Sequence, residues 1–202
     1  MLIKKVKVLI NKGSFSSSNE FTKINDQIKR SIESVDWPPG SGAFTLYPQS
    51  GKKRGEGNGV KPIKSVFLNN LKREGWDLET KLDIATVSRP GPIDATYNLG
   101  ERYFAVEWET GNISSSHRAL NKMSIGILKR ILIGGILILP TREMYQYLTD
   151  RVGNYRELKP YFPLWESLHC DEGYLAVIAI EHEGVSYDVP RIPKGTDGRA
   201  LQ

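Results

Sequence analysis

Two short, almost wholly apolar runs constrain the fold more than any other feature of this sequence. Residues 134–140 read GGILILP and residues 173–182 read GYLAVIAIEH. Each run has the length of a strand and is far too short to cross a membrane. A strand without polar alternation is stable only when both of its faces are covered. The chain therefore has to supply packed layers on both sides of a sheet.

Apolar residues at helical spacing provide the material for those layers. Residues 20–35 place Phe21, Ile24, Ile28 and Ile32 on one side, which predicts an amphipathic helix. By the same reasoning we expect helices over residues 62–75, 114–130 and 142–153, and further strands over residues 43–48, 93–98 and 102–110. Short strands that alternate with helices indicate an α/β protein with a central mixed β-sheet flanked by helices.

The length of 202 residues suits one domain, which we expect to span residues 1–202, with residues 189–202 as an irregular C-terminal arm. The composition, 39% hydrophobic and 25% charged, is that of a soluble globular protein. No apolar run is long enough for a membrane span, and the single Cys170 cannot form an internal disulfide. These features predict a cytoplasmic protein that does not enter membranes.

Basic residues gather in two Gly-rich stretches, and the net charge of +5 favours polyanionic partners. Residues 52–54 are Lys-Lys-Arg, and the tail carries Arg191, Lys194 and Arg199. Both stretches suit either solvated loops or loops that bind phosphates. Residues 55–60, GEGNGV, look like a fragment of a nucleotide-binding loop, but neither the preceding strand nor the Gly-Lys-Ser/Thr that such a loop needs is present.

A hairpin in the middle of this basic chain carries acidic residues. If its turn is symmetric about residues 98–101, Asp94 lies opposite Ala105 and diagonal to Glu107 on one face of the sheet. Glu109 shares that face by alternation. The intervening Val106 and Trp108 then point into the core, so the same strand is anchored by one face and presents carboxylates with the other.

Three neighbouring carboxylates repel one another, and such a group is tolerated by protonation or by a divalent cation. An alternating acidic strand is also what the wet face of an ordinary hairpin looks like, so a structural interpretation stays open at this point. The spacing favours a catalytic role for these carboxylates, because an Asp about a dozen residues before Glu-x-Glu or Glu-x-Lys is typical of metal-dependent phosphodiester hydrolases. Glu109 stands where such enzymes usually have the lysine.

Several ordered motifs make the resemblance more specific. Residues 91–94 (GPID), 106–123 (VEWETGNISSSHRALNKM), 147–162 (YLTDRVGNYRELKPYF) and 189–198 (VPRIPKGTDG) are similar to those of BamHI-type restriction endonucleases, in which glutamate replaces the usual lysine. Weaker matches at WPP, NGVKPIK and LETKLDI extend the resemblance over most of the chain. It implies a restriction-endonuclease-like core of the PD-(D/E)XK type.

The resemblance also implies roles for individual residues in catalysis. Asp94, Glu107 and Glu79 would be Mg²⁺ ligands, with the Trp108 backbone carbonyl completing a site for two ions. Glu109 would act as the general base that orients the attacking water, and Lys64 would lie near the scissile phosphate.

Further residues match positions of that family that contact DNA. By resemblance, the partner is double-stranded DNA with the palindrome GGATCC, cut after the first G to leave 5′ overhangs. Because a palindrome requires twofold symmetry, we expect a homodimer whose interface involves residues 115–130 and 155–168. A cognate DNA methyltransferase would act on the same site. The matching DNA-contact positions are Asn112, Ser114, Arg118, Asp150 and Arg151 for base edges in the major groove, and Gly195 and Asp197 for the minor groove.

Two rival functions are compatible with the same residues. A repair or junction-resolving nuclease with this core would select DNA by its structure instead of its sequence. A DNA-binding module with inactive carboxylates would not cut DNA with any cation.

Overall fold

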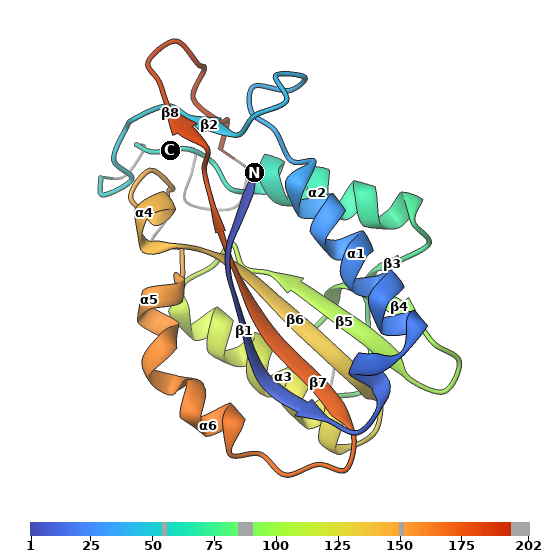
Figure 1. Ribbon diagram of the computed structural model, residues 1–202. Helices are drawn as coiled ribbons and strands as arrows, with labels where there is room; N and C mark the ends of the chain where they lie inside the picture. Colours follow the sequence, from blue (N-terminus) through green and yellow to red (C-terminus); the bar gives the residue numbers. More distant parts are fainter. Residues whose placement is uncertain (54–55, 85–90, 150–151, 195–202) are drawn as a thin grey trace.

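A six-stranded sheet forms the centre of the computed structural model, which describes residues 1–53, 56–84, 91–149 and 152–194 (Figure 1). Strands β5, β6 and β7 are mutually parallel, whereas β1, β4 and β3 are antiparallel to their neighbours, so the predicted mixed sheet is confirmed. The strand order is β1 (Leu2–Lys12), β7 (Gly173–Glu181), β6 (Leu132–Pro140), β5 (Tyr103–Trp108), β4 (Ile93–Asn98) and β3 (Asp77–Thr80).

The two apolar strands occupy the middle of the sheet, as predicted. Every residue of β6 and β7 is buried. Strand β1 was not anticipated, because its lysines interrupt any simple pattern of apolar residues. It is an edge strand whose one partner among the described strands is β7, and its Val6 and Val8 are exposed. Lysines on an edge strand discourage pairing with other chains.

Helices cover both faces of the sheet (Figure 1). On one face lie α1 (Asn19–Glu33) and α2 (Lys61–Arg73), which confirm the first two predicted helices. On the other face lie α3 (Ile113–Leu128), α5 (Tyr155–Leu158) and α6 (Phe162–Glu166). Short 3-10 turns, η1 (Phe15–Ser17) and η2 (Lys159–Tyr161), precede α1 and α6. In the part of the chain that the structure describes, no helix is long and apolar enough to cross a membrane.

Two expected elements are much shorter than predicted. The helix expected over residues 142–153 ends as α4 (Arg142–Tyr145), because the following backbone bonds to a distant segment: the Tyr147 carbonyl accepts from Asn58 N–H, and Thr149 N–H donates to the Asn58 carbonyl. The strand expected over residues 43–48 is reduced to β2 (Thr45–Leu46), since its partner β8 (Gly184–Val185) is equally short.

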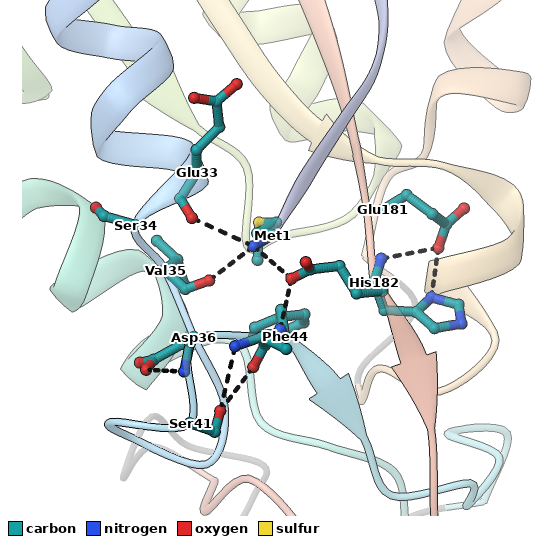
Figure 2. Close-up of polar contacts among 12 residues, drawn as sticks. Met1, Glu33, Ser34, Val35, Asp36, Ser41, Phe44, Glu181 and His182 are labelled. Carbon is teal, nitrogen blue, oxygen red and sulfur yellow. Dashed lines mark hydrogen bonds and ion pairs between the residues drawn. The ribbon is translucent and has the colours of Figure 1, made fainter.

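The α-ammonium group of Met1 is buried where β1 begins. It donates to the carbonyl oxygen of Val35 at 3.0 Å and forms an ion pair with Glu183 at 2.9 Å. The same Glu183 carboxylate accepts the Phe44 N–H, and Figure 2 labels its two donors, Met1 and Phe44. Nearby, His182 contacts Glu181. These contacts join the start of β1 to the end of α1 and to the chain that follows β7.

Candidate active site

The hairpin of β4 and β5 places the acidic residues, with a register different from the one expected. Thr96 pairs with Ala105, and Asn98 pairs with Tyr103, so Asp94 does not lie opposite Ala105. The reason is the turn, which comprises residues 99–102 and is closed by a hydrogen bond from Leu99 N–H to the Arg102 carbonyl. The register moves by an even number of residues, so Asp94 and Glu107 keep the same face and come closer together.

Asp94 is held by three groups at the start of β4. One carboxylate oxygen, Oδ1, accepts from Lys64 Nζ of α2 at 2.5 Å, and Oδ2 accepts the backbone N–H of Trp108 at 2.8 Å. The Asp94 N–H lies 3.4 Å from Oε2 of Glu107. With only 7% of its surface exposed, Asp94 is fixed by its partners in one orientation. As predicted, Val106 and Trp108 point into the core on the opposite face.

Glu109 lies just beyond the end of β5, where the chain turns into helix α3. Its Oε1 accepts the backbone N–H of Gly111 at 2.5 Å, which turns the carboxylate toward the start of the helix. The side chain of Asn112 caps α3 by accepting the Ser114 N–H at 3.0 Å. The short link between strand and helix therefore brings Glu109 beside the first turn of α3.

A cleft of about 890 Å³ opens between the hairpin and α3. It contains the three carboxylates of Asp94, Glu107 and Glu109, together with the Lys64 side chain from α2. Residues of α3 form the opposite wall, among them Ser114, Ser115, Arg118 and Lys122. This arrangement is consistent with the prediction from the sequence, which assigned the acidic residues and the expected base-reading helix to one site.

Lys122 is a cleft residue that the sequence reasoning missed. Its Nζ donates to the carbonyl oxygens of Gly91 at 2.6 Å and Pro92 at 3.1 Å, directly before Asp94 in the chain. The available signal was its position four residues after Arg118, which puts both side chains on one face of a helix. Lys122 thus ties α3 to the strand that carries Asp94.

Burial and mutual repulsion shape the charges in the cleft. Burial, with a further contribution from Asp94, raises the pKa of Glu107 to about 8, although Lys122 and Lys64 oppose the shift. Burial also raises the pKa of Glu109, against the effect of the hydrogen bond from Gly111. The pKa of Lys122 is lowered by burial, and Glu107 partly offsets this. The surroundings of the cleft therefore disfavour the ionised forms of Glu107 and Glu109.

The donor chemistry of the cleft fits a hard divalent cation. Asp94 and Glu107 offer adjacent carboxylate oxygens, which Mg²⁺ prefers, and a cation would favour the ionised form of Glu107. Within the described ranges, however, no three His, Cys, Asp or Glu side chains are grouped closely enough to hold a metal between them. Two carboxylates and surrounding oxygens are thus the donor set present, which is enough for an ion that keeps several waters.

The remaining predicted site residues lie elsewhere or outside the described ranges. Glu79 is exposed on β3 with a positive φ of 53°, and it is not among the described residues that line the cleft. The expected contacts Asp150 and Arg151, and likewise Gly195 and Asp197 of the arm, lie outside the residues that the structure describes. The structure thus brings together Asp94, Glu107, Glu109, Lys64, Ser114 and Arg118, with Trp108 and the Asn112 cap beside them.

Comparison with solved structures supports the fold. A crystal structure of the restriction endonuclease BglII complexed with a DNA 16-mer superposes with a TM-score of 0.54 at 10% sequence identity, over 89% of this chain and 79% of the BglII chain. At this identity the likeness concerns the fold alone. It confirms a restriction-endonuclease-like arrangement of the mixed sheet and its helices.

Comparison of sequences identifies the family. The chain is 50% identical to the type II restriction enzyme OkrAI of Oceanobacter kriegii over the full length of both proteins. It is 36% identical to the type II restriction enzyme BamHI of Bacillus amyloliquefaciens, over 86% of this chain and 80% of BamHI. The family model described as restriction endonuclease BamHI matches residues 1–199. The chain therefore belongs to the BamHI family of type II restriction endonucleases.

Proposed function

We propose that this protein hydrolyses double-stranded DNA at the palindrome GGATCC in a Mg²⁺-dependent reaction, cutting after the first G to leave 5′ overhangs. The observation that supports this most directly is the cleft, in which Asp94, Glu107 and Glu109 face an α3 wall with Arg118 and Lys122. Metal-assisted phosphate hydrolysis needs acidic side chains that hold the cation. It also benefits from basic side chains that bind the negatively charged phosphodiester.

The proposed cation site is built from the backbone and side chains around the hairpin. Asp94 and Glu107 would hold the ion, with the Trp108 carbonyl as a further oxygen ligand. Glu79 would take part with a second ion only if β3 brought its exposed side chain to the cleft. The chemistry that Mg²⁺ supplies when bound is that of a Lewis acid, which withdraws charge from phosphate oxygens and makes nearby water more acidic.

The protein's own groups would perform the remaining steps. Glu109 acts as the general base, because the Gly111 N–H orients its carboxylate and burial raises its pKa toward the range useful at neutral pH. Lys64, which forms an ion pair with Asp94, would contact the scissile phosphate. In-line attack of water on phosphorus then expels the 3′ oxygen and leaves a 5′ phosphate.

Base recognition is proposed for the N-terminal part of α3 and for the following loop. Asn112, Ser114 and Arg118 are exposed, and Ser114 and Arg118 line the cleft. An Arg side chain can donate to guanine in the major groove, and Asp150 beside Arg151 would pair an acceptor for cytosine with a donor for guanine. Gly195 and Asp197 would contact the minor groove.

A homodimer is proposed because the palindrome presents two equivalent half-sites. The expected interface lies on α3 and on residues 155–168. Large apolar side chains are exposed there: Leu128 at 48%, Tyr161 at 51% and Leu164 at 57%. Tyr161 packs against His117 of α3, which makes the two segments one continuous surface.

The cellular setting follows from the proposed reaction. A cytoplasmic endonuclease that cuts GGATCC requires a cognate methyltransferase that protects the same site in the host DNA. We further propose that residues 1–202 act as a single endonuclease domain, with residues 189–202 as its DNA-contacting arm.

One experiment tests the main proposal. A plasmid with mapped sites is incubated with the protein and Mg²⁺, and the product ends are sequenced. We expect 5′-phosphorylated four-base overhangs at GGATCC, and no product from Glu107→Ala at equal protein concentration. Cutting at branched or damaged DNA irrespective of sequence would indicate a repair or junction nuclease. Binding without cutting in any divalent cation would indicate a DNA-binding module.

A further inference from the structure

The Gly-rich stretch before α2 is a packed part of the protein. Within it, Asn58 is fully buried, although its side chain is polar. It lies beside two segments that are far away in the sequence: residues 147–149, which lead directly into Asp150, and residues 192–194, which lead directly into Gly195. We call this meeting point of three segments the Asn58 junction. In Figure 1 the chain between β2 and α2 passes close to α4.

Asn58 bonds to both neighbouring segments with its backbone and its side chain. Toward residues 147–149, its backbone N–H and its Nδ2 donate to the Tyr147 carbonyl at 2.7 and 2.9 Å, and its own carbonyl accepts the Thr149 N–H at 2.9 Å. Toward the tail, its Oδ1 accepts the Ile192 N–H at 3.1 Å. Nδ2 also donates to the Tyr47 carbonyl at 2.9 Å. A buried amide bonded on every side holds its surroundings in one arrangement.

Glycines allow the three backbones to approach closely. A Cβ atom on Gly51 would lie 1.7 Å from the Leu148 carbonyl oxygen, and one on Gly59 would lie 2.0 Å from the Pro193 carbonyl oxygen. No side chain can replace these hydrogens without moving the neighbouring backbone. The glycines that superficially suggest a phosphate loop therefore serve contact between chain segments.

The junction also continues into the active site. Helix α2 begins at Lys61, three residues after Asn58, and its Lys64 bonds to Asp94 in the cleft. Two further contacts brace the tail against the same stretch: Arg191 donates to Gln49 Oε1 at 2.8 Å, and Lys194 donates to the Glu56 carbonyl at 2.8 Å. The Asn58 junction thus adjoins residues 147–149, residues 192–194 and the start of the helix that carries Lys64.

We propose that Asn58 is a positioning residue that couples DNA recognition by residues 150–151 and by the C-terminal arm to the Lys64–Asp94 pair. This inference rests on the proposed function, since it assumes that those two segments contact DNA. If Asn58 fixes where both segments leave the body of the protein, correct contacts in either segment favour the arrangement in which Lys64 is aligned for cleavage. Loss of Asn58 then weakens discrimination as well as folding.

The test is a set of double-mutant cycles on the full-length chain, with Mg²⁺ and short duplexes that carry GGATCC or a singly substituted site. Asn58→Ala is combined in turn with Arg151→Ala and with Asp197→Ala, and kcat and KM are measured on both duplexes. We expect Asn58→Ala to reduce the cleavage preference for the intact site by about tenfold. We also expect the effects of Arg151→Ala and Asp197→Ala to shrink when Asn58 is already absent.

Two glycine variants separate the two branches of the junction and serve if Asn58→Ala folds poorly. Gly51→Ala pushes on Leu148 and should weaken the contribution of Arg151 alone, whereas Gly59→Ala pushes on Pro193 and should weaken that of Asp197 alone. Gly184→Ala is the matched control, because its backbone is not left-handed and a Cβ there would lie at ordinary contact distance, 3.7 Å from Thr45 Oγ1. A buried core variant, Ile28→Ala on α1, controls for lost stability.

The outcomes distinguish the inference from the proposed function. If the wild-type protein does not prefer GGATCC, the proposed function fails before any variant is considered. If the wild type prefers it and Asn58→Ala lowers only the melting temperature, as Ile28→Ala does, with additive cycles and an unchanged preference, Asn58 is merely structural and the inference is wrong. Non-additive cycles confined to the junction variants support it.

Discussion

Lys64 of α2 and Asp94 of β4 form an ion pair with 2.5 Å between Nζ and Oδ1, although 30 positions separate the two residues in the sequence. The pair joins α2 to one of the three carboxylates that line the cleft. In the free protein, Lys64 thus provides positive charge beside Asp94. The same side chain lines the cleft, and under the proposed function its ammonium group would contact a phosphate of bound DNA.

Replacing Lys64 with alanine should weaken DNA binding to all sequences by a similar factor and slow cleavage strongly. A phosphate contact carries no sequence information, so specific and nonspecific affinities fall together. Filter-binding with intact and substituted duplexes, alongside cleavage rates, measures both effects. Lys72→Ala, at the far end of the same helix, is the control. A loss confined to the intact site would contradict the phosphate role of Lys64.

Glu107→Gln should stabilise the metal-free protein above neutral pH while abolishing cleavage. The pKa of Glu107 is raised from 4.5 to about 8, so the folded state binds a proton that the unfolded state has released. Wild-type stability therefore falls as pH rises from about 4.5 to 8, and the variant lacks this loss. Near pH 8 we expect a gain of roughly 1–3 kcal/mol. Thermal unfolding across this pH range measures it.

The exposed Glu101 in the hairpin turn offers a matched control for that experiment. Glu101→Gln should leave the pH profile of the melting temperature unchanged. Parallel profiles for wild type and Glu107→Gln would show that burial in the cleft does not hinder the ionisation of Glu107.

Lys122→Met should slow cleavage and weaken DNA binding in Ca²⁺ by a similar factor for intact and substituted sites. Methionine keeps much of the side-chain volume but removes the donors to Gly91 and Pro92, which precede Asp94. It also removes a charge that lowers the pKa of Glu107, so the optimum of cleavage should move to higher pH. Rate profiles against pH test this, with Lys129→Met beyond the end of α3 for comparison. An unchanged profile would place Lys122 outside the reaction.

Arg118→Ala should reduce discrimination at one base pair by about 1–3 kcal/mol while sparing the others, as expected of a base contact. The guanidinium is exposed at the cleft and makes a single described hydrogen bond, to Ser115 Oγ at 3.2 Å. Competition binding with every single substitution of the site locates the affected position. Arg130→Ala serves as the control, because Arg130 pairs with Asp171 outside the cleft. Equal losses at every position would mean that Arg118 contacts only the DNA backbone.

Glu183→Gln should lower stability at neutral pH by roughly 2 kcal/mol. The hydrogen bond from the Met1 ammonium group, followed by that from the Phe44 N–H, lowers the pKa of Glu183 below 4.5. The stabilisation is therefore present above that pH and is lost as pH falls through the lowered pKa. Denaturant unfolding at pH 7 and at acidic pH should show wild type and variant converging in acid. A constant difference would argue against the ion pair.

The sequence by itself determined the elements whose patterns depend on local periodicity. The apolar runs became the central strands β6 and β7, and the spacing of Ile24, Ile28 and Ile32 became the buried face of α1. Alternation along β5 put Val106 in the core and Glu107 in the cleft, and this survived an error in register because the error was an even number of residues. Side-chain periodicity is a property of the local backbone, so it can be read without the fold.

Only the tertiary structure decided features that depend on partners distant in sequence. Strand β1 exists because β7 offers it an edge, and α4 stops early because Asn58 bonds to the backbone that would have continued the helix. Lys122 is part of the site because the packing of α3 brings its Nζ within hydrogen-bond distance of the Gly91 and Pro92 carbonyl oxygens. A hydrogen bond between segments separated by many residues leaves no periodic pattern in either one, since its energy depends on the packing that brings them together.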